Sequence, residues 1–293
     1  MIHFLKYKNL RPNTVRSYKN VVAQLLSQYP DLKPQDITAE HIIEWRKIIL
    51  ERAKPISWNN YARHLRSIYN FAIEHELVPM KKNPFKPFFI KEGKEKKKTY
   101  TDSQLQTIDQ LLESDYHLTS YLSPRWFINA VIKTFRYTGM RQSQLINLKI
   151  KDVDLERRVI CIASITNKNH NYHEIPISVN LYPILEKAIQ EMKKRKRVES
   201  DQLFNLNILS KRTLSRRKDM TIPQLENIFR NISKIVGFPV SSHRFRHTIA
   251  TRLMKNQDNL YLTKQLLGHS DIKVTLGYIE YHSDMLRNCV DSL

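Results

Sequence analysis

Three stretches near the N-terminus place apolar residues at the spacing of helix turns. In residues 11–29 we expect a helix that begins after Asn13, because asparagine is favoured at the N-cap. Residues 38–52 predict a second helix with Thr38 as its cap, and residues 57–75 a third. The turn-rich "VPMKKNPFKP" ends this pattern, so residues 1–90 predict a small helical bundle. The expected inward positions are Val15, Tyr18, Val22, Leu25, Leu26 and Tyr29, then Ile42, Trp45 and Ile49, then Tyr61, Leu65, Ile68 and Ala72.

A change of pattern follows this bundle. Residues 91–100 are densely charged and contain few apolar positions, which is typical of a linker. The tetrad "TDSQ" from Thr101 then matches a capping box, and it predicts that a new helix opens there. We expect a second domain over residues 101–293.

The second domain is predicted to be mostly helical with one β interlude. Ser123 and Pro124 fit the cap and first turn of a helix that Gly139 ends. The β-branched runs "RRVICIAS" and "YHEIPIS" flank a polar turn and predict a β-hairpin. The predicted fold class is therefore mainly α, with a small helical N-terminal bundle and a mostly helical second domain that carries a small hairpin. Later helices are expected over 180–196, 222–236, 243–256, 260–267 and 272–281.

Charge narrows the choice of partner. The 293 residues include 49 Lys and Arg against 28 Asp and Glu, a net charge of +21. Residues 1–90 carry +8 of this and the remainder +13, so both domains are basic. Such a field favours a polyanion, because each neutralised phosphate releases counterions. We expect DNA binding, with an RNA-associated protein of high pI as the alternative.

Other classes of protein fit the composition poorly. No apolar run approaches the length of a membrane span, and the N-terminus lacks the features of a signal peptide. The two cysteines, Cys161 and Cys289, stand in no metal-binding spacing. These patterns predict a cytoplasmic protein that makes no use of a membrane or a metal ion.

Four local patterns carry candidate chemistry. An arginine follows the glycine that ends a helix, a lysine lies in the predicted hairpin, and a histidine stands one helical turn before a second arginine. A further histidine precedes a tyrosine by nine residues. Each pattern alone also fits a capping, core or surface residue. The residues are Arg141, Lys168, His243, Arg246, His269 and Tyr278.

The order and spacing of these six residues resemble those of the tyrosine recombinase (phage integrase) family. The resemblance covers nearly the whole chain. "LGHSDIKVTLGYIEY" is similar to the C-terminal box of that family. The resemblance implies that residues 1–90 are a core-binding (SAM-like) DNA-binding domain. It also implies that residues 101–293 are the catalytic domain, with residues 283–293 as a C-terminal tail.

Elementary chemistry explains the positively charged and nucleophilic members of the set. Cleaving a phosphodiester without a metal needs cations where charge develops, and a guanidinium can hold two phosphate oxygens in a fork. Arg141 and Arg246 suit that role. Tyr278 is the expected nucleophile, and as a phenol it must lose its proton during attack.

The remaining members fit proton transfer and orientation. His243 can accept the proton of the nucleophile or orient the phosphate, with His269 as a further donor. Lys168 is expected to protonate the departing 5′ oxygen. This assignment rests on its position in the hairpin, since His170 and His173 are neighbouring rivals. The product would be a 3′-phosphotyrosyl bond, formed without any cofactor.

The resemblance has one exception and leaves several points open. The family usually has a carboxylate where this chain has Gln144, an amide that can orient neighbours but brings no charge. Tyr281 lies one turn beyond Tyr278 and is expected to be a packing or DNA-proximal residue.

The resemblance further implies partners: double-stranded DNA with a specific recombination site, a homotetramer on two duplexes, and possible accessory DNA-bending or directionality proteins. The tail can dock onto a neighbouring subunit or fold back on its own domain. The chain begins almost at the core-binding domain, so we expect no additional arm-binding module.

The expected function is site-specific recombination of the integrase type, for integration, excision or resolution of a mobile element. Two alternatives share the scaffold. One is a site-specific DNA-binding protein that has lost turnover, and the other is a DNA-relaxing type IB topoisomerase.

Overall fold

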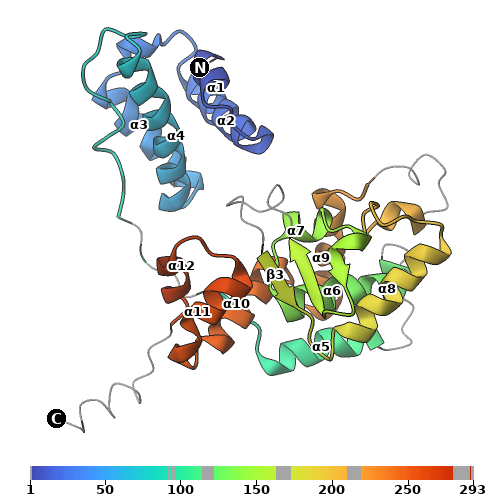
Figure 1. Cartoon of the computed structure of the whole chain (residues 1–293). Helices are drawn as coiled ribbons and strands as arrows, with labels where there is room; N and C mark the ends of the chain where they lie inside the picture. Colours follow the sequence, from blue (N-terminus) through green and yellow to red (C-terminus); the bar gives the residue numbers. More distant parts are fainter. Residues whose placement is uncertain are drawn as a thin grey trace. The chain divides into compact units, whose positions relative to one another are not determined.

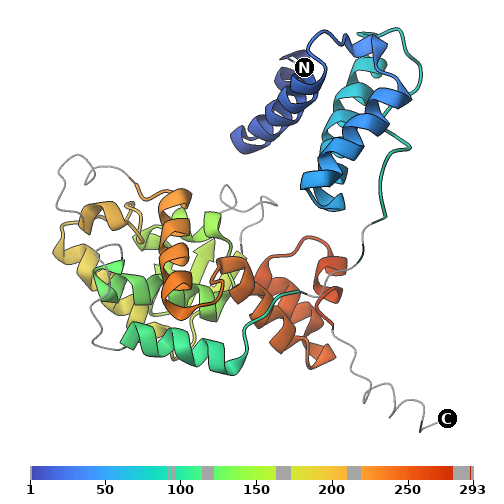
Figure 2. The same cartoon turned by 180° about the vertical axis from the view of Figure 1, so that it is seen from behind.

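Two compact units make up the chain. The computed structural model describes residues 2–91, 93, 97–113, 122–162, 173–209, 219–279 and 291. Contacts divide the chain into Met1–Glu95 and Lys96–Leu293. Each unit has its own hydrophobic core, and helices dominate both (Figures 1 and 2). The predicted mainly α fold class with a small sheet is confirmed.

The α-helices described in the N-terminal unit are α1 (Ile2–Tyr7), α2 (Pro12–Gln28), α3 (Ala39–Arg52) and α4 (Pro55–Glu74). The sequence predicted Asn13 as the N-cap of α2, and this prediction is wrong. Arg11 holds that position, because Pro12 has no backbone N–H to satisfy and its fixed φ suits the first helical residue. The short helix α1 was not predicted.

Two tryptophans set the direction of the core in this unit. Thr38 caps α3 as predicted, accepting a hydrogen bond from the backbone of His41. Trp45 of α3 and Trp58 of α4 meet edge to face with their ring centroids 5.3 Å apart, and both are fully buried. With this contact, α4 buries Trp58, Ala62, Leu65 and Tyr69. Leu65 is buried as predicted, whereas the predicted Tyr61, Ile68 and Ala72 are only half-buried.

In its described residues, the second unit contains the helices α5 (Asp102–Glu113), α6 (Arg125–Thr138), α7 (Gln142–Ile146), α8 (Tyr182–Lys194), α9 (Ile222–Val236), α10 (Ser242–Leu253), α11 (Leu260–Leu267) and α12 (Ile272–Leu276). Helix α6 packs against α8 and α10, and α11 contacts α10, α12 and the sheet. In Figure 1 the helices α10, α11 and α12, coloured orange to red, form a group at one end of the unit.

A three-stranded antiparallel sheet completes this unit. Strands β2 (Val159–Ile162) and β3 (His173–Pro176) pair with Ile160 opposite Ile175. This confirms the predicted hairpin strands, while the turn between them lies outside the described residues. Strand β1 (Val153–Asp154) adds to β2 and was not predicted, because a two-residue strand leaves no alternation in the sequence.

Several helix ends differ from the prediction; α8 is shorter than the predicted 180–196, and α10 ends at Leu253 rather than at residue 256. Pro124 itself is the N-cap of α6, where the sequence predicted Ser123 as cap and the proline inside the first turn. Helix α12 ends at Leu276, short of the predicted residue 281, because Gly277 closes the helix as its C-cap. No helix in the described ranges combines the length and apolarity that crossing a membrane requires.

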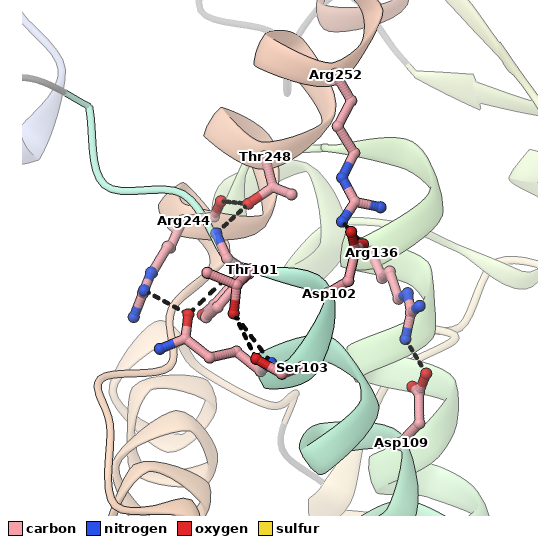
Figure 3. A network of polar contacts seen from close by, with 10 residues as sticks. Thr101, Asp102, Ser103, Asp109, Arg136, Arg244, Thr248 and Arg252 are labelled. Carbon is pink, nitrogen blue, oxygen red and sulfur yellow. Dashed lines mark hydrogen bonds and ion pairs between the residues drawn. The ribbon is translucent and has the colours of Figure 1, made fainter.

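A polar network ties α10 to the start of α5 (Figure 3). The predicted capping box is present: Thr101 and Gln104 exchange hydrogen bonds through their side chains. Arg244 donates to the Gln104 side chain over 2.8 Å and to the carbonyl of Thr99. Thr248 accepts a hydrogen bond from the backbone N–H of Tyr100 over 2.8 Å. One side of α10 is thereby fixed, and its other side is free to carry functional groups.

Candidate active site

A glycine turn places the first arginine. Helix α6 ends at Gly139, whose φ of +62° lies in the left-handed region that glycine tolerates best. A Cβ there would stand 2.9 Å from a methyl group of Leu267, so the turn approaches its neighbours too closely for a side chain. The chain reverses at Gly139, and Arg141 becomes the N-cap of α7.

The second arginine binds the same turn. Arg246 of α10 is only 5% exposed, and it donates to the carbonyl oxygens of Gly139 over 2.8 Å and Leu267 over 2.6 Å. Burial, followed by the nearby charge of Arg141, lowers the pKa of Arg246 to about 10. Burial likewise lowers the pKa of Arg141, whose Nη2 lies 3.4 Å from the carbonyl oxygen of Gly268.

In the described part of the chain, carbonyl oxygens rather than carboxylates contact the two guanidinium groups. Among the described residues, no carboxylate forms an ion pair with Arg141 or Arg246. The buried Nη1 of Arg141 also has no hydrogen-bond partner there. The site thus holds two neighbouring, partly buried cations that contact carbonyl dipoles. Such a site favours the binding of an anion with several oxygen atoms.

Helix α11 and the turn after it position His269. Gly268 ends the helix with a φ of +59°. The His269 side chain is 8% exposed, and its Nδ1 lies 2.9 Å from the hydroxyl of Thr275 in α12. Burial, followed by the charges of Arg246 and Arg141, lowers the pKa of His269 to about 4. The imidazole is therefore neutral near pH 7.

Tyr278 reaches this group from the end of α12. It is 5% exposed, and its ring stacks parallel to that of His269 with the centroids 6.1 Å apart. Burial raises the pKa of the phenol more than Arg246 and Arg141 lower it, so Tyr278 keeps its proton near neutrality.

Helix α10 contributes two histidines. His243 and His247 stand one turn apart with their ring centroids 6.5 Å apart. The Nδ1 of His247 lies 3.0 Å from the hydroxyl oxygen of Tyr278. Burial is the main cause that lowers both pKa values, that of His247 to about 4. His247 was missed in the sequence, although its i, i+4 spacing from His243 places both on one helix face.

A lysine from the segment before α5 also reaches the tyrosine. The ammonium of Lys97 lies 3.1 Å from the centroid of the Tyr278 ring. Burial lowers the pKa of this lysine to about 8. Nothing in the sequence distinguishes Lys97 from Lys96 and Lys98, and the whole stretch was read as linker.

Two further polar residues contact the backbone beside the arginines, one at the start of α7 and the other at the end of α11. The Gln144 side-chain oxygen accepts a hydrogen bond from the backbone N–H of Arg141 over 2.7 Å, so this amide fixes the start of α7. His173, the first residue of β3, lies 3.3 Å from the carbonyl oxygen of Leu266 through its Nε2. Both arginines lower the pKa of His173 in addition to burial, so its imidazole lies beside the pair.

The structure thus brings together five of the six predicted residues: Arg141, His243, Arg246, His269 and Tyr278. Lys168 lies outside the described residues, as do Tyr281 and the tail apart from residue 291. No group of three or more His, Cys, Asp or Glu in the described ranges could hold a metal ion. A pair of cations, neutral imidazoles and a phenol can bind a phosphate and attack it.

Sequence comparison identifies similar proteins. Residues 100–285 match the model of the phage integrase family. The chain is 34% identical over 289 residues to a Pseudomonas aeruginosa protein provisionally named tyrosine recombinase XerC, covering 95% of this chain and 67% of that protein. A Pseudomonas syringae protein of the same name is 34% identical over 290 residues, covering 97% and 61%. The chain therefore spans about three fifths of the length of the latter relative.

Solved structures share the fold. One is the Tn1549 transposon integrase in complex with transposon right end DNA, with a TM-score of 0.76 and 21% identity, covering 99% of this chain and 96% of that one. Another is a lambda integrase dimer bound to a core site, with a TM-score of 0.69 and 18% identity, covering 96% and 95%. At these identities the likeness concerns the fold.

Proposed function

The chain belongs to the phage integrase family of tyrosine recombinases, and from that premise we propose that it is a site-specific DNA recombinase. It cleaves and rejoins DNA through a 3′-phosphotyrosyl bond on Tyr278. The observation that carries the proposal is the gathering of the buried Tyr278 and His269 beside Arg246 and Arg141, which contact the carbonyl oxygens of Leu267 and Gly268.

The arginines bind the scissile phosphate. Their planar forks match two non-bridging oxygens, and burial strengthens these contacts relative to water. They act most strongly in the pentavalent transition state, where charge on those oxygens is greatest. His269 and His243 orient the phosphate, and Gln144 supports Arg141 through the backbone N–H that it binds.

The covalent step exchanges one phosphate ester for another. The Oη of Tyr278 bonds to phosphorus while the bond to the 5′ oxygen breaks, and Lys168 supplies the proton that this oxygen needs. Because the phosphotyrosyl link retains the ester, a 5′ hydroxyl from another duplex can reverse the step and join a new strand. The scheme uses no ATP and no metal ion.

The basic N-terminal unit binds the DNA on which this site acts. It carries an excess of positive charge, and Arg63 and Arg66 lie together in a surface hollow on α4. We assign residues 1–90 to core binding, residues 91–100 to a linker and residues 101–293 to catalysis. The same proposal includes assembly as a homotetramer on two duplexes, accessory proteins and a cytoplasmic location. It also includes the integration, excision or resolution of a mobile element.

A nicked suicide duplex tests the proposal. Sheared DNA of the organism that encodes the chain is first used to capture fragments that remain bound to the protein under denaturing conditions. A duplex with the captured site and a nick just beyond the cleavage point then traps the intermediate. We expect an adduct with the native chain and none with Tyr278→Phe. Absence of any adduct would favour the binding-only alternative.

Strand exchange is measured separately. Joining between two duplexes that both carry the site is expected of a recombinase. Adduct formation with relaxation of supercoils but without joining would instead indicate a topoisomerase.

A further inference from the structure

The proton of the Tyr278 hydroxyl has one evident destination. The phenol must lose this proton as its oxygen bonds to phosphorus, and its pKa is raised by burial. A proton acceptor must lie within hydrogen-bond reach of the oxygen. In the described ranges, the histidine that meets this requirement is His247, whose Nδ1 is 3.0 Å away.

The protonation states of the two partners allow the proton to pass along that hydrogen bond. Near neutrality Tyr278 keeps its single hydroxyl proton and His247 is a neutral imidazole. The phenol can therefore donate to the Nδ1 of His247 in the tautomer that carries the imidazole proton on Nε2.

The other groups around Tyr278 occupy different positions. His269 stacks on the ring face, and its Nδ1 is engaged with the hydroxyl of Thr275. The ammonium of Lys97 also lies over the ring. Among the described contacts, His243 has no hydrogen bond to the phenol. Its ring centroid lies 6.5 Å from that of His247, and after burial the charges of Arg246 and Arg141 lower its pKa.

We propose that His247 is a further catalytic residue, the general base that takes the proton of Tyr278 during cleavage and returns it during rejoining. The inference rests on the proposed recombinase function. As the bond from Oη to phosphorus forms and the bond to O5′ breaks, the phenol proton passes to Nδ1 and the imidazole becomes a cation. O5′ takes a separate proton from Lys168 and leaves as a hydroxyl.

Bound DNA makes this transfer easier. The groups facing His247 are Lys97, His243, Arg246 and Tyr278, and the cations among them oppose a positive imidazole. A phosphate between the arginines brings negative charge that offsets them, so the imidazole becomes a stronger base when substrate is present. The free enzyme thereby keeps its nucleophile protonated until DNA arrives. His243 is left to orient the phosphate.

A sulfur-substituted substrate distinguishes the loss of a general base from the loss of a general acid. In a 5′-bridging phosphorothiolate the leaving atom is sulfur, and a thiolate departs without a proton because thiols are stronger acids than alcohols. We expect His247→Asn, which preserves a polar atom near the position of Nδ1 but is not basic, to slow adduct formation roughly 10²- to 10⁴-fold. The loss should be equal on the oxygen and sulfur substrates. The defect of Lys168→Ala should largely disappear on sulfur.

Controls make each outcome decisive. His3→Asn makes the same replacement at an exposed histidine of the N-terminal unit and should react at the native rate. DNA affinity and Tm of His247→Asn should equal those of Tyr278→Phe, and His247→Gln serves if the first variant fails to fold. A rate within threefold of native, or a defect that sulfur removes, overturns the role of His247. If the native chain itself forms no adduct on either substrate, the proposed function fails instead.

Discussion

The guanidinium of Arg246 donates to the carbonyl oxygen of Gly139, 107 positions earlier in the chain, over 2.8 Å. The same arginine binds the carbonyl oxygen of Leu267 at the end of α11. One side chain therefore joins the ends of α6 and α11 to the middle of α10. The residue proposed to bind the phosphate also holds together the turns that form the site.

The Gly139 turn should not tolerate a side chain. Gly139→Ala forces a left-handed conformation on an L-residue and places a Cβ 2.9 Å from a Leu267 methyl group. We expect a loss of about 1–2 kcal/mol in unfolding free energy from the conformation alone. Gly277→Ala is the matched control, because its φ is −66° and its nearest neighbour is the mobile end of Lys97. Urea unfolding measures both, and an equal loss in the two variants would contradict the argument.

Replacing Arg246 by lysine should separate binding from catalysis. A lysine keeps the charge but cannot reach two carbonyl oxygens and a phosphate with one planar fork. We expect Arg246→Lys to lower the rate of adduct formation by roughly 10²- to 10³-fold, the usual effect of losing one charge-stabilising donor. DNA affinity in a gel-shift assay should change little. Native cleavage by this variant would show that positive charge alone suffices.

Lys97 should make stability depend on pH in a definite direction. Its pKa is lowered to about 8 in the folded protein, whereas a free lysine has a pKa of about 10.4. Between these values the unfolded chain binds more protons, so the lysine contributes a rise in unfolding free energy as pH increases from 8 toward 10.4. We expect native protein to gain stability relative to Lys97→Met from pH 7.5 to 9.5. A constant difference in urea midpoint across this window would contradict the burial of the ammonium.

A glutamate should be accepted at Gln144. The side-chain oxygen of Gln144 binds the backbone N–H of Arg141, and a carboxylate oxygen can make the same bond. The Nε2 atom that would be lost has no partner among the described residues. We expect Gln144→Glu to form the adduct within about threefold of the native rate. Abolished cleavage would show that the neutral amide is required beside Arg141.

The sequence predicted the elements better than their orientation. The helical spacing and the hairpin were recoverable because each leaves a local pattern. The buried stripe of α4 was not, since the contact between Trp45 and Trp58 determines it and that contact joins two helices. The N-cap of α2 was predicted at Asn13 because asparagine is a favoured cap residue. Pro12 is instead the first residue of the helix, so the N-cap is the preceding Arg11.

The candidate site shows the same division. Arg141, Arg246, His269 and Tyr278 stand in recognisable motifs, and the structure brings them to one place. His247 adjoins Arg246 in the sequence, but its role depends on where Tyr278 turns after Gly277. Lys97 is one of three consecutive lysines, and only the path of the chain before Tyr100 selects it. The contact of His247 with Tyr278 joins residues 31 positions apart, and that of Lys97 joins residues about 180 positions apart, so neither leaves a local signal.

Identification of the residue linked to DNA tests the central claim most directly. After reaction with the nicked suicide duplex, the protein is digested and the peptide that carries a nucleotide is sequenced by mass spectrometry. We predict a 3′-phosphate ester on Tyr278, retained in Tyr281→Phe and absent in Tyr278→Phe. A link on Tyr281 or any other side chain, or a link through a 5′ phosphate, would contradict the account.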